Sequence, residues 1–463
     1  MPVSEHLSVK KHFTVFKHLV RWTVIILPVA FVIGSLVALF LWLLTWAIHF
    51  RFAHPWLLYL LPLAGIAIYF AYNLYGKNAE KGNNLIIDEI HEAGGGVPKR
   101  MTPLVLLTTV VTHLFGGSAG REGTAVQMGG SIAQVFSYWF KLNEVDTRVI
   151  LTAGIAAGFG AVFGTPLAGA IFAIEVLTLG RIQYTSLIPC LVAGIIGDIT
   201  VSGWGIHHTV YHIVIVKANA LLFAPYMRID LGLLIKIIIA SVAFGLASML
   251  FEKAVHGVKK VFNKYIYPKW AIPAIGGLII IALTFAIGKP DYLSLGVDAE
   301  YHGAVTIPSA FNAGGADTWS WLWKTIYTTI TLGSGFKGGE VTPLFYIGAT
   351  LGNTLSGLMN APVSLFAALG FIAVFAGATN TPLASTFMGV ELFGSEYALF
   401  FAVACFTAYF FSGESGIYSA QRIAIPKIFD DNLQVESIAE AEQKRQKYMG
   451  RRLAKYRISK KKK

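Results

Sequence analysis

Charged side chains are scarce in this sequence. Asp, Glu, Lys and Arg make up 13% of its 463 residues, whereas hydrophobic residues make up 55%, and the mean hydropathy is +0.61. A soluble globular domain carries about 25% charged residues, so this composition excludes a soluble enzyme. The sequence therefore predicts an all-α polytopic membrane protein.

Cysteine is nearly absent, and the metal-binding motif His-Glu-x-x-His does not occur. The two cysteines, Cys190 and Cys405, lie far apart in apolar runs, where we expect them to be buried as small hydrophobic residues. This spacing excludes a disulfide framework and a cysteine metal site. We therefore expect no metal, no cofactor and no Gly-x-Ser-x-Gly nucleophile, so a membrane-embedded enzyme lacks support.

The charge that is present concentrates at the two ends of the chain. Basic residues gather between positions 10 and 21 and again between 444 and 463, and the formal net charge is +12. The positive-inside rule predicts that residues 1–18 and a basic tail at 426–463 both face the cytoplasm. Attraction to anionic lipid explains this charge, so nucleic acid is not required as a partner. The first apolar run, 24–48, is too long for a cleavable signal peptide.

Between the basic ends, apolar runs of uneven length follow one another. They lie at about 19–50, 56–75, 102–115, 124–140, 149–179, 187–204 and 231–251, and then at about 270–287, 319–332, 344–359, 363–378, 383–393 and 397–411. A full crossing needs about 20 apolar residues. The shorter runs therefore predict broken or steeply tilted helices that are buried in protein.

Residues 114–132 place two charges, Arg121 and Glu122, and six glycines inside a region that is otherwise apolar enough for a membrane segment. The stretch reads LFGGSAGREGTAVQMGGSI. A charge in hydrocarbon costs roughly 3 kcal/mol, so such a pair marks a polar path. The glycines allow the backbone to leave a helix, and a new helix is predicted from Thr124 onward. Glu122 then lies near a helix N-terminus, where N–H groups and the helix dipole favour an anion. The carboxylate would compete with that anion.

A second glycine-broken stretch, GSGFKGGEVTP at residues 333–343, carries Glu340 and opens another predicted helix. Either stretch alone could be a glycine-rich surface loop with solvated charges. Two such stretches favour a transporter in which broken helices aim their positive ends into a cavity in the membrane.

An internal repeat organises the chain. Residues 154–175 align without gaps on residues 370–391, with eight of 22 positions identical, including the run Thr-Pro-Leu-Ala. The pattern predicts two inverted-topology repeats, at about 56–205 and 270–425, with a site at their interface near the midplane. A chance match in Gly/Ala-rich sequence is the alternative.

These motifs resemble those of the CLC family of anion channels and anion/proton antiporters. GREGT at 120–124 resembles the GREGP motif of the family, and GGEVTP at 338–343 resembles GGxFxP. Tyr418, in GIYSAQRI, is similar to the tyrosine that coordinates the central anion. The resemblance spans residues 19–425 and implies the CLC fold, a homodimer, and Glu122 as the gating and proton-coupled glutamate.

The departures from the family pattern carry further information. Where the family has GSGIP, this chain has GNNLI at 82–86, so that Asn83 replaces a serine. A rival alignment would use GGGVP at 94–98, but that run lies too close to GREGT. Val341 replaces the phenylalanine of GGxFxP, and Val176 replaces the internal proton glutamate. This set of changes resembles the fluoride-exporting branch of bacterial CLC proteins.

The resemblance implies roles for individual residues. Glu340 would be a second proton carrier, because a buried carboxyl group can take up a proton near neutral pH. The implied anion-binding residues are Asn83, Gly120, Arg121, Gly123, Val341, Thr342 and Tyr418. Their amide, hydroxyl and backbone donors could replace the tight hydration shell of fluoride. Helix caps, a turn asparagine, an interfacial tyrosine and a structural ion pair remain open as alternative roles for these side chains.

We therefore expect a fluoride/proton antiporter of the bacterial inner membrane, which crosses it several times and exports fluoride against inward proton movement. Two alternatives keep the same fold: a chloride or nitrate exchanger, and a passive anion channel in which Glu122 is only a gate. Asn83 together with Glu340 argues against the chloride exchanger, since that class would keep Ser and Phe in the two anion motifs.

Overall fold

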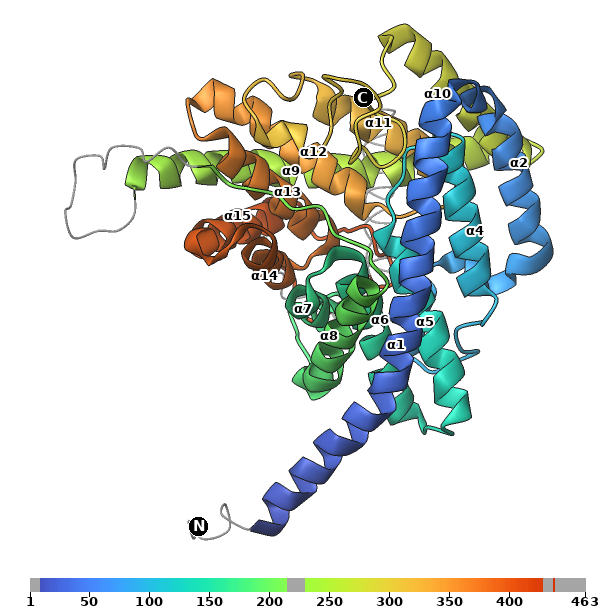
Figure 1. Cartoon of the computed structure of the whole chain (residues 1–463), viewed down its shortest axis with the longest axis vertical. Helices are drawn as coiled ribbons and strands as arrows, with labels where there is room; N and C mark the ends of the chain where they lie inside the picture. Colours follow the sequence, from blue (N-terminus) through green and yellow to red (C-terminus); the bar gives the residue numbers. More distant parts are fainter. Residues whose placement is uncertain (1–8, 215–229, 428–435, 438–463) are drawn as a thin grey trace, which may run out of the picture.

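The computed structural model describes residues 9–214, 230–427 and 436–437, and these residues are mainly helical (Figure 1). The α-helices are α1 (Val9–Ala53), α2 (Leu61–Ala71), α3 (Asn83–His91), α4 (Met101–Leu114), α5 (Glu122–Trp139), α6 (Glu144–Phe163), α7 (Pro166–Glu175), α8 (Leu187–Gly203), α9 (Leu231–Tyr265), α10 (Ala271–Ile287), α11 (Ser320–Gly333), α12 (Val341–Met359), α13 (Val363–Thr379), α14 (Pro382–Phe393) and α15 (Ala398–Phe411).

Short elements join these helices. They are the 3-10 helices η2 (Pro55–Leu60), η4 (Lys77–Lys81), η5 (Tyr184–Ser186), η6 (Ser309–Phe311) and η7 (Ser395–Tyr397), the π-helix η3 (Tyr72–Gly76), and the strands β1 (Thr178–Leu179), β2 (Arg422–Ile423) and β3 (Glu436–Ser437). β2 pairs in parallel with β1 and antiparallel with β3, which fixes the chain after α15 beside the end of α7.

Helix length follows the uneven pattern of the sequence. Among the described residues, five helical segments are long and apolar enough to cross a membrane: Phe16–Ala53, Pro55–Lys81, Glu144–Phe163, Tyr184–Gly203 and Leu231–Tyr265. Several other apolar helices have only 10–17 residues. Large apolar side chains of α1, such as Trp42 and Trp46, are exposed on its outer face and suit contact with lipid. The expectation of an all-α membrane fold with broken helices is confirmed.

The boundaries of several elements differ from the expected ones. Helix α1 begins at Val9 instead of residue 19, so half of the expected N-terminal segment 1–18 is helical. The single run expected at 149–179 is divided into α6 and α7, because Gly164 adopts φ 70° and Pro166 starts the next helix. The expected tail at 426–463 lies almost wholly outside the described residues.

Equivalent glycines bring equivalent helices into backbone contact in the two repeats. A Cβ atom on Gly129 of α5 would lie 2.1 Å from the carbonyl oxygen of Gly154 in α6. In the second repeat, a Cβ atom on Gly348 of α12 would lie 2.0 Å from the carbonyl oxygen of Gly370 in α13. Only glycine permits this approach, which is a common way to pack helices within a membrane.

The two repeats also exchange capping carboxylates. Glu175, at the C-terminal end of α7, accepts hydrogen bonds from the N–H groups of Leu383 (3.0 Å) and Ala384 (2.7 Å) at the start of α14. Glu391, in the last turns of α14, accepts the equivalent bonds from the start of α7 at 2.9 and 2.8 Å. Each acid thus satisfies N–H groups that the other helix leaves free. This reciprocal arrangement is what two inverted repeats require.

We predict that Glu175→Leu lowers thermal stability, because it leaves two buried N–H groups without acceptors at a cost of about 1–3 kcal/mol each. Glu175→Gln keeps one acceptor, so its thermal stability should lie between those of the unmodified protein and Glu175→Leu. Thermal unfolding of the detergent-solubilised protein measures the effect, with Glu396→Leu, at an exposed position, as the control. Equal melting temperatures for Glu175→Leu and the control would contradict this capping role.

Candidate anion site

Two glycine loops meet at the centre of the described structure. The N–H of Gly120 donates to the carbonyl oxygen of Gly339 at 2.6 Å, and the N–H of Gly339 donates to that of Gly120 at 2.7 Å. Side chains would prevent this pairing, since a Cβ on Gly338 would lie 2.5 Å from the Cβ of Ala119. Because each loop runs directly into a helix, the pair brings the N-terminal ends of α5 and α12 together.

The Glu122 carboxylate lies between these two helix ends. Its Oε2 atom accepts from the N–H of Thr342 at 3.0 Å and from the N–H of Arg121 at 3.1 Å. The Thr342 hydroxyl lies 2.6 Å from both carboxylate oxygens, and Arg121 Nε lies 3.6 Å from Oε1. With only 1% of its surface exposed, the carboxylate occupies a position that suits a small anion.

A narrow cavity of about 20 Å³ borders this carboxylate. Its polar lining comes from Arg121, Glu122, His208, Thr209, Tyr211 and Thr342, and its apolar lining includes Phe345 and Phe371. This volume holds about one water-sized particle. A single small ion could therefore stand next to Glu122, or replace its carboxylate at the helix ends if that side chain turned away.

Glu340 and Asn83 lie together beside the first turn of α5. A Cβ atom on Gly123 would lie 3.1 Å from Asn83 Nδ2 and 3.9 Å from Glu340 Oε2, so both side chains reach this glycine. Asn83 is the first residue of α3 and is 8% exposed, and its Oδ1 has no hydrogen-bond partner within the described part of the chain. Glu340 is half-buried. An amide and a carboxyl group therefore share one small space.

Tyr418 is buried at 4% exposure and packs edge-on against the ring of Phe172, with centroids 6.3 Å apart. Sequence reasoning missed the neighbour that positions it: the N–H of Ala420 donates to Asn84 Oδ1 at 3.0 Å. The second asparagine of GNNLI thus ties the loop after Tyr418 to the start of α3.

Val341 begins α12 as Glu122 begins α5, so the two residues hold equivalent positions in the two repeats. Val341 is 1% exposed and brings no polar group to the site. The run 94–98 that could have replaced Asn83 in the alignment lies at the other end of α5, since the N–H of Val97 donates to Gln134 Oε1 at 3.3 Å. Gln134 is about 18 Å along the helix from Glu122, at 1.5 Å per residue.

Residues 116–120, GGSAG, have the Gly-x-Ser-x-Gly spacing of hydrolase nucleophiles. Ser118 is fully buried, and its hydroxyl group forms a 2.9 Å hydrogen bond with the hydroxyl group of Thr328 in α11. The loop joins two helices, whereas a nucleophile elbow joins a strand to a helix. The geometry assigns Ser118 to the contact between the two repeats.

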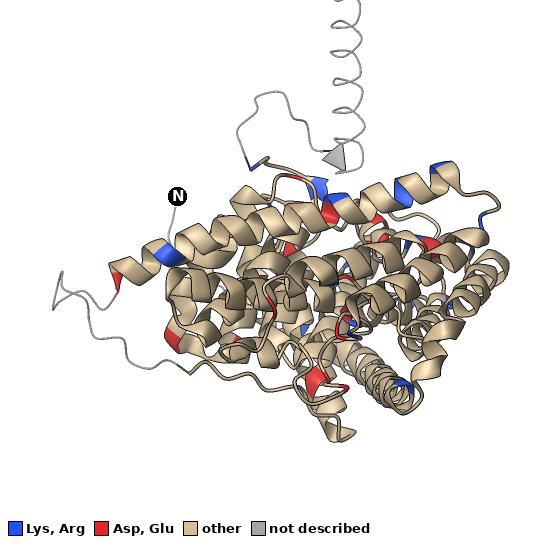
Figure 2. Cartoon of the chain, turned by 90° about the horizontal axis from the view of Figure 1, so that it is seen from above, with Lys and Arg blue, Asp and Glu red and all other residues tan. Residues whose placement is uncertain are grey.

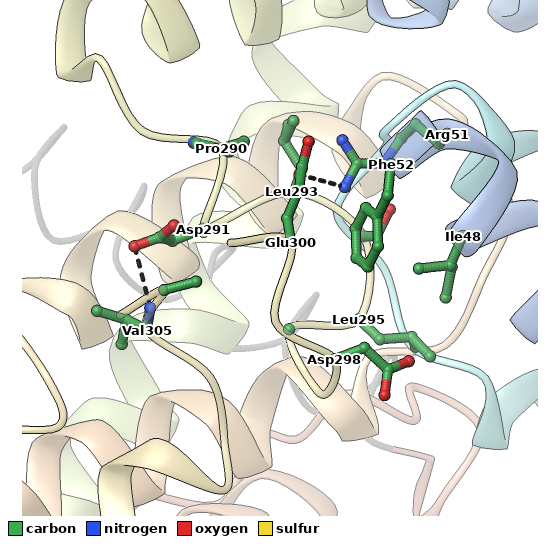
Figure 3. Close-up of a pocket in the computed structure, with 13 residues that line it drawn as sticks. Ile48, Arg51, Phe52, Pro290, Asp291, Leu293, Leu295, Asp298, Glu300 and Val305 are labelled. Atoms are coloured by element: carbon green, nitrogen blue, oxygen red, sulfur yellow. Dashed lines mark hydrogen bonds and ion pairs between the residues drawn. The ribbon is translucent and has the colours of Figure 1, made fainter. Parts of the chain in front are cut away.

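Two buried cations, Arg51 and Lys324, were not identified from the sequence. Arg51, at the end of α1, is 3% exposed and pairs with Glu300 at 2.8 Å beside a second small cavity (Figure 3). Lys324 of α11 is fully buried and donates to the carbonyl oxygens of Tyr292 (3.1 Å) and Ser294 (2.7 Å). Both cations anchor the long connection between α10 and α11. A charge inside an apolar run was the signal that could have identified them.

Gly339→Ala should destabilise the protein, because the added Cβ would lie 2.8 Å from the N–H nitrogen of Gly123 and force the two helix ends apart. We expect a loss of about 1–3 kcal/mol, the usual cost of overpacking. Gly357→Ala in α12 is the matched control, since its added Cβ would meet nothing within 4 Å. Thermal unfolding of both variants measures the difference, and a stable Gly339→Ala protein would show that the contact tolerates a side chain.

The chain is similar to known proteins over most of its length. Residues 64–413 match the family model described as "Voltage gated chloride channel". The chain is 47% identical over 413 residues to a "Chloride/fluoride channel protein" of Pseudomonas syringae pv. tomato, covering 89% of this chain and 88% of that protein. The crystal structure of a CLC-type fluoride/proton antiporter matches with TM-score 0.80 and 32% identity, covering 88% and 98% of the two chains. A slow cyanobacterial Cl⁻/H⁺ antiporter matches in fold, with TM-score 0.71 and 20% identity over 86% and 96%.

Proposed function

Since this chain belongs to the voltage gated chloride channel (CLC) family, we propose that it is a fluoride/proton antiporter that exports fluoride from the cytoplasm and lets protons move inward. The support comes from a solved relative that is a fluoride/proton antiporter and from a 47% identical relative that is named a chloride/fluoride channel protein. The single observation that carries the mechanism is the position of the Glu122 carboxylate, at the meeting point of two helix N-termini.

Exchange follows from competition for this position. When Glu122 is charged, its carboxylate accepts the N–H and hydroxyl groups of Thr342 and excludes an anion from the same donors. When it takes up a proton, it loses the charge that these donors stabilise, and fluoride can replace it. Because one position holds either the carboxylate or the anion, proton binding and fluoride binding are coupled.

The donors at the site suit fluoride. Fluoride is small and strongly hydrated, so a selective site must offer close, directional hydrogen bonds in place of water. The Thr342 hydroxyl group and the N–H groups of α5 and α12 supply them beside the 20 Å³ cavity. Asn83 and Tyr418 would receive the ion on the other side of the Gly120–Gly339 pair.

Glu340 would carry the proton through the second half of the pathway. Its carboxyl group lies near Asn83 and Gly123, at the first turn of α5. Val176, where the family often has an internal proton glutamate, is apolar and buried at 2% exposure. A proton that leaves Glu122 therefore needs another acceptor, and Glu340 is the acid attached to the facing loop.

The proposal also covers the membrane, the oligomeric state and the orientation of the chain. The chain is a membrane protein of the CLC fold, and we propose that it forms a homodimer in the bacterial inner membrane with both termini in the cytoplasm. The orientation rests on the basic residues between positions 10 and 21 and in the tail. A passive fluoride channel gated by Glu122 is the second candidate, favoured by the word channel in the name of the Pseudomonas relative.

Proteoliposomes that contain the purified protein should show uphill proton movement when a fluoride gradient is applied. Glu122→Gln should keep anion flux and lose nearly all proton movement, because an amide occupies the same space but cannot be protonated in this range. Fluoride electrodes and internal pH dyes measure the two fluxes together. Fluoride flux without proton movement in the unmodified protein would assign it to the passive channels.

Asn83→Ser should weaken the preference for fluoride over chloride, since it shortens a donor and enlarges the space beside Gly123. We expect a change of about 10–150-fold in the ratio of fluoride to chloride flux, corresponding to about 1.5–3 kcal/mol for one hydrogen bond to a charged group. Asn78→Ser is the comparison variant, because Asn78 lies at an exposed position in η4, where its side chain accepts from Arg100. Equal flux ratios in the unmodified protein and Asn83→Ser would remove Asn83 from the selectivity site.

A further inference from the structure

A larger cavity, of about 310 Å³, lies away from the anion site where the ends of several helices meet. The end of α2, the last turns of α9 and the ends of α10 and α11 surround it, and α2 and α10 lie side by side (Figure 1). Part of the cavity wall is apolar and aromatic, and it includes Tyr72, Ile272 and Pro273. None of the residues assigned to the anion site lines this cavity.

Positive charge dominates the polar side of this cavity. Lys259, Lys269 and Lys337 line it together with a single acid, Glu80. Within the described ranges, none of the three lysines forms an ion pair within 4 Å of a carboxylate. Lys337 is half-buried, with its ammonium group 4.1 Å from the ring centroid of Tyr72. Of these lysines, Lys269 donates to the carbonyl oxygen of Asn263, which also lines the cavity. Three ammonium groups and a single acid around a hollow space favour an anionic ligand.

Two of the helices that border the cavity also carry exposed apolar side chains. Leu63 and Phe70 of α2 and Leu278 of α10 are 63%, 44% and 58% exposed, and they suit contact with lipid. Lys and Arg residues gather along the upper edge of the molecule, where the long helix α9 runs, while most of the body is uncharged (Figure 2). Basic pockets between membrane helices at the level of the headgroups bind anionic lipids.

We propose that this cavity binds the phosphate headgroup of an anionic phospholipid, with the acyl chains along α2 and α10. The three lysines hold the phosphate, and Tyr72, Ile272 and Pro273 contact the glycerol region. The volume agrees with this ligand, because it is far larger than the 20 Å³ space beside Glu122 that would hold one small ion. Binding does not depend on which anion the protein transports.

A lipid at this position would act on the anion site through the second glycine loop. Lys337 directly precedes Gly338 and Gly339, and Gly339 forms the backbone pair with Gly120. A bound phosphate would neutralise Lys259 and Lys337 and fix the loop that carries Glu340. The lipid is therefore a regulator of transport as well as a ligand.

The test is lipid retention by the purified full-length protein. Protein is extracted in mild detergent from vesicles of equal phosphatidylglycerol and phosphatidylcholine, and native mass spectrometry counts the bound lipids. We expect phosphatidylglycerol to be retained in preference. Lys259→Gln/Lys269→Gln/Lys337→Gln should reduce its retention on the order of tenfold or more, since each lysine near an anionic headgroup contributes about fivefold. Replacing the three lysines with Arg should preserve it.

Two variants keep the test informative. Lys260→Gln, on the same helix but outside the cavity, should retain lipid like the unmodified protein. Lys259→Gln alone changes an exposed position and still applies if the triple variant does not fold. Unchanged phosphatidylglycerol retention in Lys259→Gln and the triple variant would overturn the proposal.

Two other outcomes would assign the cavity to a different ligand and overturn the proposed lipid site. Loss of bound lipid in millimolar inorganic phosphate would indicate a soluble phosphate ligand. A higher apparent KM for fluoride in the triple variant, in pure phosphatidylcholine vesicles, would indicate a collecting vestibule for the transported anion. Because lipid retention is measured without any flux, its failure is distinct from a failure of the proposed transport function.

Discussion

The backbone pair between Gly120 and Gly339 is the contact on which the rest of the site depends. A helix that breaks inside a bilayer leaves N–H and C=O groups without water to satisfy them. Here the N–H and C=O groups of Gly120 and Gly339 hydrogen-bond to each other, at 2.6 and 2.7 Å. This pairing brings the N-terminal ends of α5 and α12 together. Two positive helix ends then face the same point, which allows an anion to bind inside the membrane without a cage of arginines.

The frame around this pair is symmetric, but its side chains are not. Glu122 holds the position that Val341 holds in the other repeat, so one helix end carries an acid and the other an apolar side chain. The second acid, Glu340, stands one residue before Val341 and lies beside Asn83 and Gly123. Glu122 instead contacts Thr342. The two acids therefore have different neighbours, although the frame that carries them is symmetric.

The sequence predicted the broken helices and the repeats, because each left a local mark: a charge in an apolar run, a glycine cluster or a repeated motif. Only the family resemblance placed Thr342 at the anion site. The sequence did not predict contacts that only the tertiary structure decides. The exchange of caps by Glu175 and Glu391, the support of the Tyr418 loop by Asn84 and the burial of Lys324 join residues that are far apart in the chain. Helix α5 begins at Glu122, before the expected Thr124, since the pairing of Gly120 already orders the backbone there.

Glu122 and Glu175 make the same kind of contact, a carboxylate on the N–H groups at the start of a helix in the other repeat, yet only one of them suits a gate. Glu175 is held by two consecutive N–H groups of α14, and Glu391 makes the reciprocal contact, so moving either acid would disrupt the packing of α7 against α14. Glu122 is held by Thr342 and by the neighbouring Arg121, and it borders a cavity of about 20 Å³. Its side chain can turn while α5 and α12 stay in place. The free space beside the carboxylate, more than the strength of its hydrogen bonds, therefore separates a moving gate from a fixed cap.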